Sequence, residues 1–408
     1  MELFNVLTVQ QARQTLSKHV IRREEETVPL LEGLNRVLSR DIVSLEEVPG
    51  FDRSTMDGYA VRARDIFGAA ESLPAYVNIA GEVIMGREAA GFLEPGQAWA
   101  IPTGGMLPAG ADAVVMVEYT EELDEKTIGI TRPVAPGENV VRRGEDVMAG
   151  LTILTAGHRL RPQDLGLLAA VGVTRVPVLM PLKVGILSTG DELTEPNQPV
   201  PPGKVRDINS YALYGQVLEA GGMPRLYGIV EDDFDTLRNT MVQALAENDM
   251  ILISGGSSVG TRDVTARVID TLGKPGVLFH GMAIKPGKPS IGAMVDGKAV
   301  FGLPGHPVSA MVVFNLLARP FIESLDISGD LRKFPLRAVM TRNVHSATGR
   351  DDFLRVVLRR GEDGTLLAEP VLGKSGLIST MVKADGVAHL PLNKEGVEAG
   401  EWVDVWLF

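Results

Sequence analysis

The chain has 408 residues, of which 45% are hydrophobic and 23% are charged, a composition that predicts a folded protein of several domains rather than a disordered or fibrous one. Its 52 acidic and 40 basic residues give a net charge of −12, the opposite of the basic field that binds nucleic acid, so no nucleic-acid partner is expected. The absence of cysteine excludes disulfides, thiolate metal ligands and cysteine nucleophiles.

The N-terminal segment from Met1 to Val20 lacks a basic region followed by an apolar stretch, and no run approaches the roughly 18 apolar residues of a membrane span. We therefore expect a cytoplasmic protein with no membrane partner. Thr8 followed by Gln11 has the pattern of a capping box, which predicts a helix over residues 8–20. The leucine spacing of residues 30–38 indicates a second helix or turn.

A small β domain is predicted between about residues 50 and 145, which are rich in Gly, Pro and short β-branched runs such as Ala113 to Val117. Arg161-Pro162-Gln163-Asp164 then places a proline in the first turn of a helix that runs to Gly172. We expect this helix to pack on the N-terminal one.

Residues 183–325 alternate between short apolar runs and helical patterns, which indicates a parallel sheet covered by helices. From residue 334 short strands return, separated by turns at Gly361 to Gly364 and Gly373 to Gly376, and they predict a C-terminal β barrel or sandwich. The strands expected in the α/β region are Val184–Leu187, Leu226–Val230, Met250–Ile253, Val277–Phe279 and Ala299–Leu303, and the helices are Ser210–Leu218, Leu237–Ala246, Val264–Leu272 and Pro307–Leu325.

Polar, glycine-containing segments follow the predicted strands of the α/β region. Ligands bind outside the carboxyl ends of parallel strands, so we expect these segments to gather around one anion-binding rim. Taken singly, each is also explained as a turn or a helix cap. The segments are Ser188-Thr189-Gly190-Asp191-Glu192, Glu231-Asp232-Asp233, Ser254-Gly255-Gly256-Ser257-Ser258-Val259-Gly260 and Leu303-Pro304-Gly305-His306-Pro307.

Local positive charge comes from Lys285-Pro286-Gly287-Lys288-Pro289, whose prolines and glycine would hold two ammonium groups in a fixed turn facing that rim. An exposed basic turn without a ligand is the alternative interpretation. In the β domain, Asp57 and Asp146 lie in polar motifs, and together with Glu192 they offer the oxygen ligands that suit Mg²⁺. A cleft between two domains would bring them together.

Two other classes of protein compete with an anion-binding enzyme. Gly256-Ser257-Ser258-Val259-Gly260 satisfies the G-x-S-x-G pattern of a serine hydrolase, but Gly255 and Gly256 separate the serine from its strand. The later Asp and His of a triad also have no obvious places, because lone histidines near strand ends, such as His280 and His306, are more often structural. A dimer-forming adaptor without enzymatic activity would not need so many polar loops. Neither G-x-G-x-x-G nor a Walker A motif is present, which disfavours dinucleotide and ordinary nucleotide hydrolysis chemistry.

These motifs, in this order, resemble those of the molybdopterin molybdenumtransferase family, which includes MoeA and the gephyrin E domain. The resemblance spans nearly the whole chain. The adenylyltransferase that makes the activated pterin shares the α/β domain and is the nearest enzymatic alternative, but it lacks the β domains. The motifs that carry the resemblance are Met56-Asp57-Gly58-Tyr59-Ala60-Val61, Arg143-Gly144-Glu145-Asp146, Ser188-Thr189-Gly190-Asp191-Glu192, Ser254-Gly255-Gly256, Lys285-Pro286-Gly287-Lys288-Pro289 and Leu303-Pro304-Gly305.

The resemblance implies a multidomain fold. Its parts would be an elongated N-terminal helical region (1–45 and 147–180), an inserted β domain (46–146), a central parallel-sheet α/β molybdopterin-binding domain (181–328) and a C-terminal β barrel (329–408). It also implies a homodimer with a shared active site, and transient contact with the adenylyltransferase and with cofactor acceptors.

In function, the resemblance implies that adenylylated molybdopterin and molybdate react with Mg²⁺ to give molybdenum cofactor and AMP. Molybdate and tungstate, both tetrahedral and doubly charged, fit the residue pattern equally. Asp57, Asp146 and Glu192 would be catalytic and hold the cation. The residues expected to bind substrate are Thr103, Ser188, Thr189, Asp232, Ser254, Gly255, Gly256, Asp263, Lys285, Lys288, Pro304 and Pro307.

The chain departs from the family pattern at three positions. Gly281 stands where some relatives carry lysine, His306 replaces the asparagine common after Pro-Gly, and Ser257 replaces an apolar residue. Because none of them is an expected cation ligand, these departures bear on substrate affinity more than on the reaction class.

Overall fold

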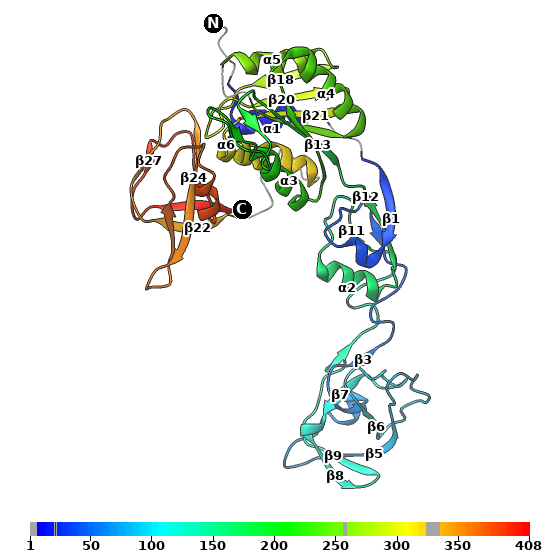
Figure 1. Ribbon diagram of the computed structural model, residues 1–408. Helices are drawn as coiled ribbons and strands as arrows, with labels where there is room; N and C mark the ends of the chain where they lie inside the picture. Colours follow the sequence, from blue (N-terminus) through cyan, green and yellow to red (C-terminus); the bar gives the residue numbers. More distant parts are fainter. Residues whose placement is uncertain (1–5, 20, 22, 256–258, 324–334) are drawn as a thin grey trace. The chain divides into compact units, whose positions relative to one another are not determined.

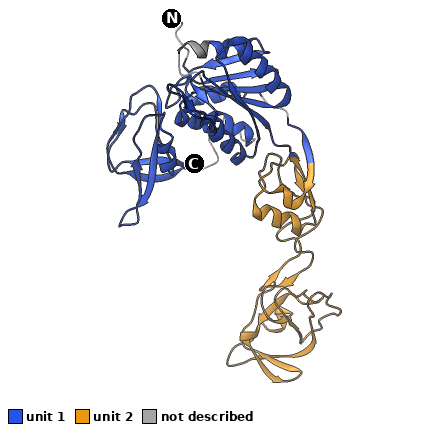
Figure 2. Ribbon diagram, viewed as in Figure 1, with its two compact units in different colours: residues 1–26, 179–408 blue, residues 27–178 orange. Residues whose placement is uncertain are grey.

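The computed structural model describes residues 6–19, 21, 23–255, 259–323 and 335–408, with the side chains of 259–263 outside that description. The chain forms two compact units, one of residues 1–26 with 179–408 and one of residues 27–178 (Figure 2). Each unit is described by itself. Within the described residues, no helix combines the length and the apolarity that crossing a membrane requires.

The α/β domain of the first unit is built on a sheet with the order β16-β13-β17-β21-β20-β18 (Figure 1). Strands β16, β13, β17 and β21 are parallel neighbours, as the alternating sequence pattern predicts. The strands are β13 (Lys183–Thr189), β16 (Met223–Val230), β17 (Met250–Gly255), β18 (Pro275–His280), β20 (Ile291–Val295) and β21 (Lys298–Leu303). The helices are α3 (Asn209–Glu219), α4 (Phe234–Glu247), α5 (Val259–Asp270), α6 (Pro307–Val313), the π-helical turn η4 (Phe314–Ala318) and α7 (Arg319–Ile322), with the short strands β14 (Leu193–Thr194) and β15 (Val205–Arg206) beside the sheet.

The prediction of a wholly parallel sheet is wrong at one strand. β20 runs antiparallel to both β21 and β18, so the sheet is mixed. β20 and β21 form a hairpin whose turn is Asp296-Gly297, with Asp296 at a φ of 47°. This strand was not among those expected, because the run Ile291 to Val295 is buried at every position and carries neither the alternation of a half-buried strand nor any mark of its direction.

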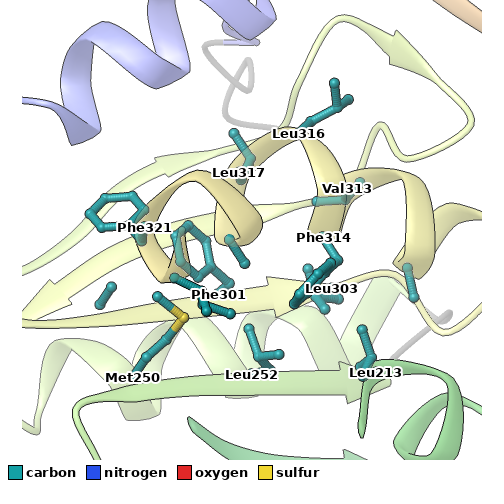
Figure 3. Packing of buried hydrophobic residues seen from close by; sticks show 14 of the residues in the cluster. Leu213, Met250, Leu252, Phe301, Leu303, Val313, Phe314, Leu316, Leu317 and Phe321 are labelled. Atoms are coloured by element: carbon teal, nitrogen blue, oxygen red, sulfur yellow. The ribbon is translucent and has the colours of Figure 1, made fainter. Parts of the chain in front are cut away.

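Successive residues of β17 bury their side chains on opposite faces of the sheet. Met250 and Leu252 belong to one apolar cluster, with α3 and α6, whereas Ile251 and Ile253 belong to another, with α4 and α5. Figure 3 shows the first cluster, in which Val313 of α6 and phenylalanine and leucine side chains of η4 and α7 pack on the strands. Burial on both faces explains why these strands read as continuous apolar runs.

The first helix, α1 (Val9–Leu16), has the predicted capping box but ends four residues before the predicted end at residue 20. Its buried residues Ala12 and Leu16 join the apolar cluster of the α/β domain. The expectation that it packs against the helix opened by Pro162 stays a prediction, because the two helices belong to different units. That helix, α2 (Pro162–Ala170), buries Leu168 in a separate cluster.

The C-terminal barrel is confirmed as a closed structure. β24 pairs with both β25 and β26, and the ring β24-β25-β22-β28-β26 returns to β24. β19 of the α/β domain adds to this sheet by pairing in parallel with the start of β24. The elements are β19 (Ile284–Lys285), β22 (Leu336–Met340), β23 (Val344–His345), β24 (Asp351–Arg360), β25 (Leu366–Pro370), α8 (Ser379–Lys383), β26 (Gly386–Leu390), β27 (Gly396–Val397) and β28 (Trp402–Leu407).

The second unit contains the inserted β domain, whose sheet has the order β7-β4-β6-β5-β9-β8. Its apolar core includes Tyr59, Val61 and Ile128. The elements are β3 (Arg53–Ser54), β4 (Gly58–Val61), η2 (Ala63–Asp65), β5 (Ala75–Glu82), β6 (Gln97–Ile101), β7 (Ala113–Met116), η3 (Val117–Tyr119), β8 (Thr120–Asp124), β9 (Thr127–Ile130) and β10 (Val140–Val141).

The prediction of an elongated N-terminal helical region is wrong, because this part of the chain consists mostly of strands. Residues 30–38, where a helix or turn was expected, contain only the 3-10 turn η1 (Leu30–Gly33). Val37 and Leu38 instead form β-bridges to Arg159 and Val178. The strands pair as β1 with β12 and β2 with β11, with the bounds β1 (Glu25–Pro29), β2 (Ile42–Val43), β11 (Thr152–Leu154) and β12 (Arg175–Leu179).

Candidate functional site

The polar motifs of the α/β domain meet at the carboxyl ends of three adjacent strands. Thr189 at the end of β13 is in register with Gly255 at the end of β17, and Ser254 is in register with Leu303 of β21. A Cβ atom on Gly255 would lie 2.0 Å from the carbonyl oxygen of Thr189, so only glycine allows the two strand ends to approach this closely. The rim predicted from the sequence therefore exists.

Ser188 supports this rim through a buried hydrogen bond. Its side chain is fully buried, and its hydroxyl lies 2.8 Å from that of Ser210 at the start of α3. The Ser210 hydroxyl in turn donates to Asp207, so Ser188 is the donor in the first hydrogen bond. This chain fixes the start of α3 against the end of β13, and a role for Ser188 in binding substrate stays a prediction.

Carboxylates gather beside the rim. The Thr189 hydroxyl donates to Asp232, and the backbone N–H of Asp232 donates to Asp191 Oδ1 at 3.4 Å. Burial raises the pKa of the Asp232 carboxyl, and the nearby charges of Asp191 and Glu192 raise it further. Glu192 itself is exposed.

A cavity of about 520 Å³ lies where the Lys285–Pro289 turn and the Pro304–Ser309 segment face the barrel. Both lysines of the turn line it, and Lys285 Nζ lies 3.2 Å from Asp352 Oδ2. Asp352 is the one carboxylate among the described lining residues. The charged lining residues other than histidine are Lys285, Lys288, Arg350, Asp352, Arg355 and Lys374.

The barrel side of this cavity carries basic residues that sequence reasoning missed. In the described part of the chain, Arg350 has no ion pair and its Nε has no hydrogen-bond partner. Arg355 is buried, donates from Nη2 to the Gly373 carbonyl at 2.7 Å and leaves its own Nε without a partner. Burial lowers the pKa of the Arg355 guanidinium. Excess positive charge and unmet donors indicate a site for an anion.

His306, one of the departures from the family pattern, also lines the cavity. It precedes the first residue of α6, and its Nδ1 lies 2.9 Å from the hydroxyl of Ser375 in the barrel. The predicted residue Pro304 lies in the same wall, and Pro307 begins α6. Gly281, the second departure, has a φ of 113° and receives a backbone hydrogen bond from Leu7.

In the β domain, the predicted pair Asp57 and Thr103 are in direct contact. The backbone N–H of Thr103 donates to Asp57 Oδ1 at 2.7 Å. This hydrogen bond, with a second from the Thr103 hydroxyl, lowers the pKa of Asp57, whose side chain is exposed to solvent. Asp57 is therefore held in place and ionised.

Asp146 lies in the same unit as Asp57, in one of several short segments that hydrogen-bond to one another. Its backbone N–H donates to the Val48 carbonyl, while β3 pairs with β10 and Arg143 donates its N–H to Asp52. The side chain of Asp146 is exposed. The motifs around Asp57, Thr103 and Asp146 thus rest on segments tied by backbone hydrogen bonds.

A complete metal centre is not formed within the described residues, where no group of three or more His, Asp or Glu side chains is placed to hold an ion. Asp57 and Asp146 belong to residues 27–178, and Glu192 belongs to the other unit. Gly256 and Ser257 lie outside the described residues, as does the side chain of Asp263. The roles expected of these residues stay predictions.

Comparison with known families assigns nearly the whole chain. Residues 7–172 match the MoeA N-terminal region (domain I and II), residues 185–324 match a family described as a probable molybdopterin binding domain, and residues 337–408 match the MoeA C-terminal region (domain IV). The three matches follow one another in the order of the fold described above.

Individual relatives agree along their full length. The molybdopterin molybdenumtransferase of Haemophilus influenzae is 35% identical over 410 aligned positions, covering 98% of both chains, and that of Bacillus subtilis is 34% identical, covering 94% of this chain and 90% of its own. Among solved structures, a molybdopterin biosynthesis MoeA protein from Pyrococcus horikoshii OT3 is 33% identical with a TM-score of 0.84, covering 99% of this chain and all of its own.

Proposed function

Because the chain belongs to the MoeA family of molybdopterin molybdenumtransferases, enzymes of molybdenum cofactor biosynthesis, we propose that it inserts molybdenum into adenylylated molybdopterin. The proposed reaction cleaves the bond that joins the adenylate to the pterin phosphate, releases AMP and places molybdenum on the dithiolene sulfurs. The observation that carries the proposal is the basic cavity between the Lys285–Pro289 turn and the barrel.

The cavity suits a small dianion. Lys288, Arg350 and Lys374 have no carboxylate within ion-pair distance among the described residues, so their charges are not neutralised by the protein. Asp352 offsets part of the charge of Lys285 and holds its ammonium group, with the Ser346 hydroxyl donating to the same carboxylate at 3.0 Å. Molybdate carries two negative charges and four oxygen acceptors, which match this set of donors.

A divalent cation fits the remaining predicted residues. Asp57 and Asp146 present exposed carboxylates, and the lowered pKa of Asp57 keeps it ionised, the form that binds a hard cation such as Mg²⁺. With Glu192 and substrate phosphate oxygens they would hold the ion, which would neutralise charge on the phosphates. Thr103 would keep the Asp57 carboxylate oriented toward it.

We further infer a homodimer in which the β domain of one subunit completes the site of the other, and a cytoplasmic location. Transient contacts with the adenylyltransferase and with acceptors of the finished cofactor belong to the same proposal. The same proposal divides the chain into four domains, formed by residues 1–45 with 147–180, 46–146, 181–328 and 329–408.

Light scattering after size exclusion tests the dimer, and a mixture of an Asp57→Asn protein with a Lys288→Gln protein tests the shared site. Restored activity in the mixture would support a shared site, and its absence would argue against one.

The decisive experiment mixes the purified protein with adenylylated molybdopterin, molybdate and Mg²⁺ and measures AMP and molybdenum-loaded cofactor together. The proposal expects both products to rise in equal amounts. AMP release that continues unchanged without molybdate and yields no loaded cofactor would reduce the protein to a hydrolase. No AMP under conditions in which the Bacillus subtilis relative is active would overturn the proposal.

A further inference from the structure

A buried asparagine links the strand-end rim to the basic cavity. Asn209, the first residue of α3, is only 7% exposed. Its Nδ2 donates two hydrogen bonds, one to the Ser254 hydroxyl at the end of β17 and one to the Gly305 carbonyl, each at 2.8 Å. Gly305 itself lines the cavity. One side chain therefore joins α3 to two segments of the proposed substrate site.

The orientation of this amide follows from its partners. A carbonyl oxygen can only accept a hydrogen bond, so the nitrogen of Asn209, and not its oxygen, must face Gly305. The same nitrogen faces Ser254 and uses its second hydrogen there, which makes the Ser254 hydroxyl the acceptor. The hydrogen of that hydroxyl must then point away from Asn209.

Two polar groups at this point remain unsatisfied. Among the described residues, no acceptor receives the Ser254 hydroxyl hydrogen, and Asn209 Oδ1 has no partner although it is buried. Leaving such groups unpaired is costly, so each one in a native protein calls for an explanation, such as a bound water, ion or ligand. A ligand oxygen would satisfy the Ser254 hydroxyl.

We propose that Asn209 is a positioning residue, which holds the Ser254 hydroxyl as a hydrogen-bond donor toward an anionic oxygen of the bound pterin substrate and anchors Gly305 in the cavity wall. The inference rests on the proposed function for the identity of the substrate. Asn209 acts through Ser254 and Gly305 and does not itself perform chemistry.

The test replaces the amide by a carboxylate of the same shape. In Asn209→Asp, neither carboxylate oxygen can donate, so the Ser254 hydroxyl turns to donate to residue 209, and the contact with the Gly305 carbonyl becomes repulsive. An acidic residue in the first turn of a helix is favourable, which helps the variant to fold. Affinity for adenylylated molybdopterin, measured by equilibrium dialysis without molybdate, is expected to fall about tenfold, which corresponds to about 1.4 kcal/mol.

A double-variant cycle separates positioning from a general loss of structure. Ser254→Ala removes the hydroxyl that Asn209 orients, so the double variant is expected to bind little worse than Ser254→Ala alone. In turnover assays the loss should fall on KM, with kcat changed less than about threefold. Fully multiplicative effects of the two substitutions on affinity would overturn the proposal.

Asn248 offers a matched control at the opposite end of the same sheet. It is 3% exposed, and its Nδ2 also donates to one hydroxyl, Tyr227 Oη at 2.6 Å, and to one carbonyl, that of Ala244 at 2.8 Å. Asn248→Asp should lower the unfolding midpoint as much as Asn209→Asp does but leave substrate affinity unchanged. Equal losses of affinity in the two variants would show a structural effect only.

The binding measurement also keeps this inference separate from the proposed function. A protein that binds the adenylylated pterin but inserts no molybdenum would refute the proposed reaction. The affinities of the wild type, the two single variants, the double variant and the Asn248→Asp control would still decide the role of Asn209. A protein that does not bind this substrate at all would refute both.

Discussion

The backbone N–H of Thr103 donates a 2.7 Å hydrogen bond to Asp57 Oδ1, although 46 residues separate the two in sequence. Asp57→Asn keeps an oxygen for this bond but removes the negative charge. If Asp57 holds the cation, insertion activity should fall by about 100-fold or more, the scale of losing one electrostatic contact in an active site. Stability should change by less than about 0.5 kcal/mol, since the side chain is exposed.

Asp124 provides the control for that variant. It is exposed in the same β domain, it accepts the backbone N–H of Lys126 at 2.7 Å, and this bond lowers its pKa as well. Asp124→Asn should leave insertion unchanged. An Asp57→Asn protein with wild-type turnover would remove Asp57 from the list of cation ligands.

Lys288→Gln should weaken molybdate binding about tenfold, because a charge-assisted hydrogen bond contributes about 1.5–3 kcal/mol. The remaining affinity should depend less on salt than that of the wild type. Lys274→Gln is the control, since Lys274 is an exposed lysine at the start of β18, outside the cavity lining. Dialysis against radioactive molybdate measures both. Equal affinity of the two variants would place the anion elsewhere.

Gly255→Ala should destabilise the protein by about 1–3 kcal/mol, because its Cβ would meet the Thr189 carbonyl at 2.0 Å and push two strand ends apart. Gly215→Ala is the matched substitution in α3, where an added Cβ meets nothing within 4 Å. It should stabilise the helix by about 0.5–1 kcal/mol. Urea unfolding distinguishes the two, and a neutral Gly255→Ala would contradict the close approach of the strands.

Asp164 predicts an acid-dependent loss of stability in the second unit. A side-chain hydrogen bond from Arg161 chiefly lowers its pKa, and His158 Nε2, at 2.7 Å, lowers it further. Because the folded-state pKa lies below the unfolded one, the stabilisation is complete above about pH 5 and disappears as the pH falls through the folded-state value. Asp164→Asn should therefore cost about 1–2 kcal/mol at pH 7, discounted because Arg161 is half exposed.

Unfolding at pH 5 and pH 3 checks the sign of that effect. The difference between wild type and Asp164→Asn should be smaller at pH 3 than at pH 5. A difference that grows from pH 5 to pH 3 would mean that the carboxylate is not stabilised in the folded state.

The order of elements in the α/β domain could be predicted because each strand is a short apolar run and each helix a longer amphipathic one. Neither the existence nor the direction of β20 could be predicted, since a short, fully buried run lacks alternation and carries no mark of its orientation. In the N-terminal region, Leu38 has helical spacing with its neighbours, but its partner is Val178. Pairing across such a separation leaves no local signal, and the helical interpretation failed there.

The lack of a local signal for long-range contacts also explains which site residues could be predicted and which could not. Lys285 and Lys288 could be predicted because they share one turn with rigid flanks, and the structure places both at the cavity. Arg350 directly precedes the barrel strand β24, and Arg355 lies on it. The alternation of a strand predicts which side chains share a face, but it does not predict which segment of another domain that face contacts. Asn209 directly precedes the helix expected at Ser210–Leu218, where asparagine normally indicates a cap, so its link to Ser254 was hidden in sequence.

The parallel pairing of β19 with β24 makes the barrel part of the α/β domain's own framework. Lys285 is in register with Asp352, and the backbone N–H of Asp351 donates to the Ala283 carbonyl at 2.8 Å. A lineage that lost the barrel would also lose the main-chain ladder that holds its lysine turn. Grafting the lysine motif alone onto an isolated α/β domain is therefore not expected to recreate the anion site.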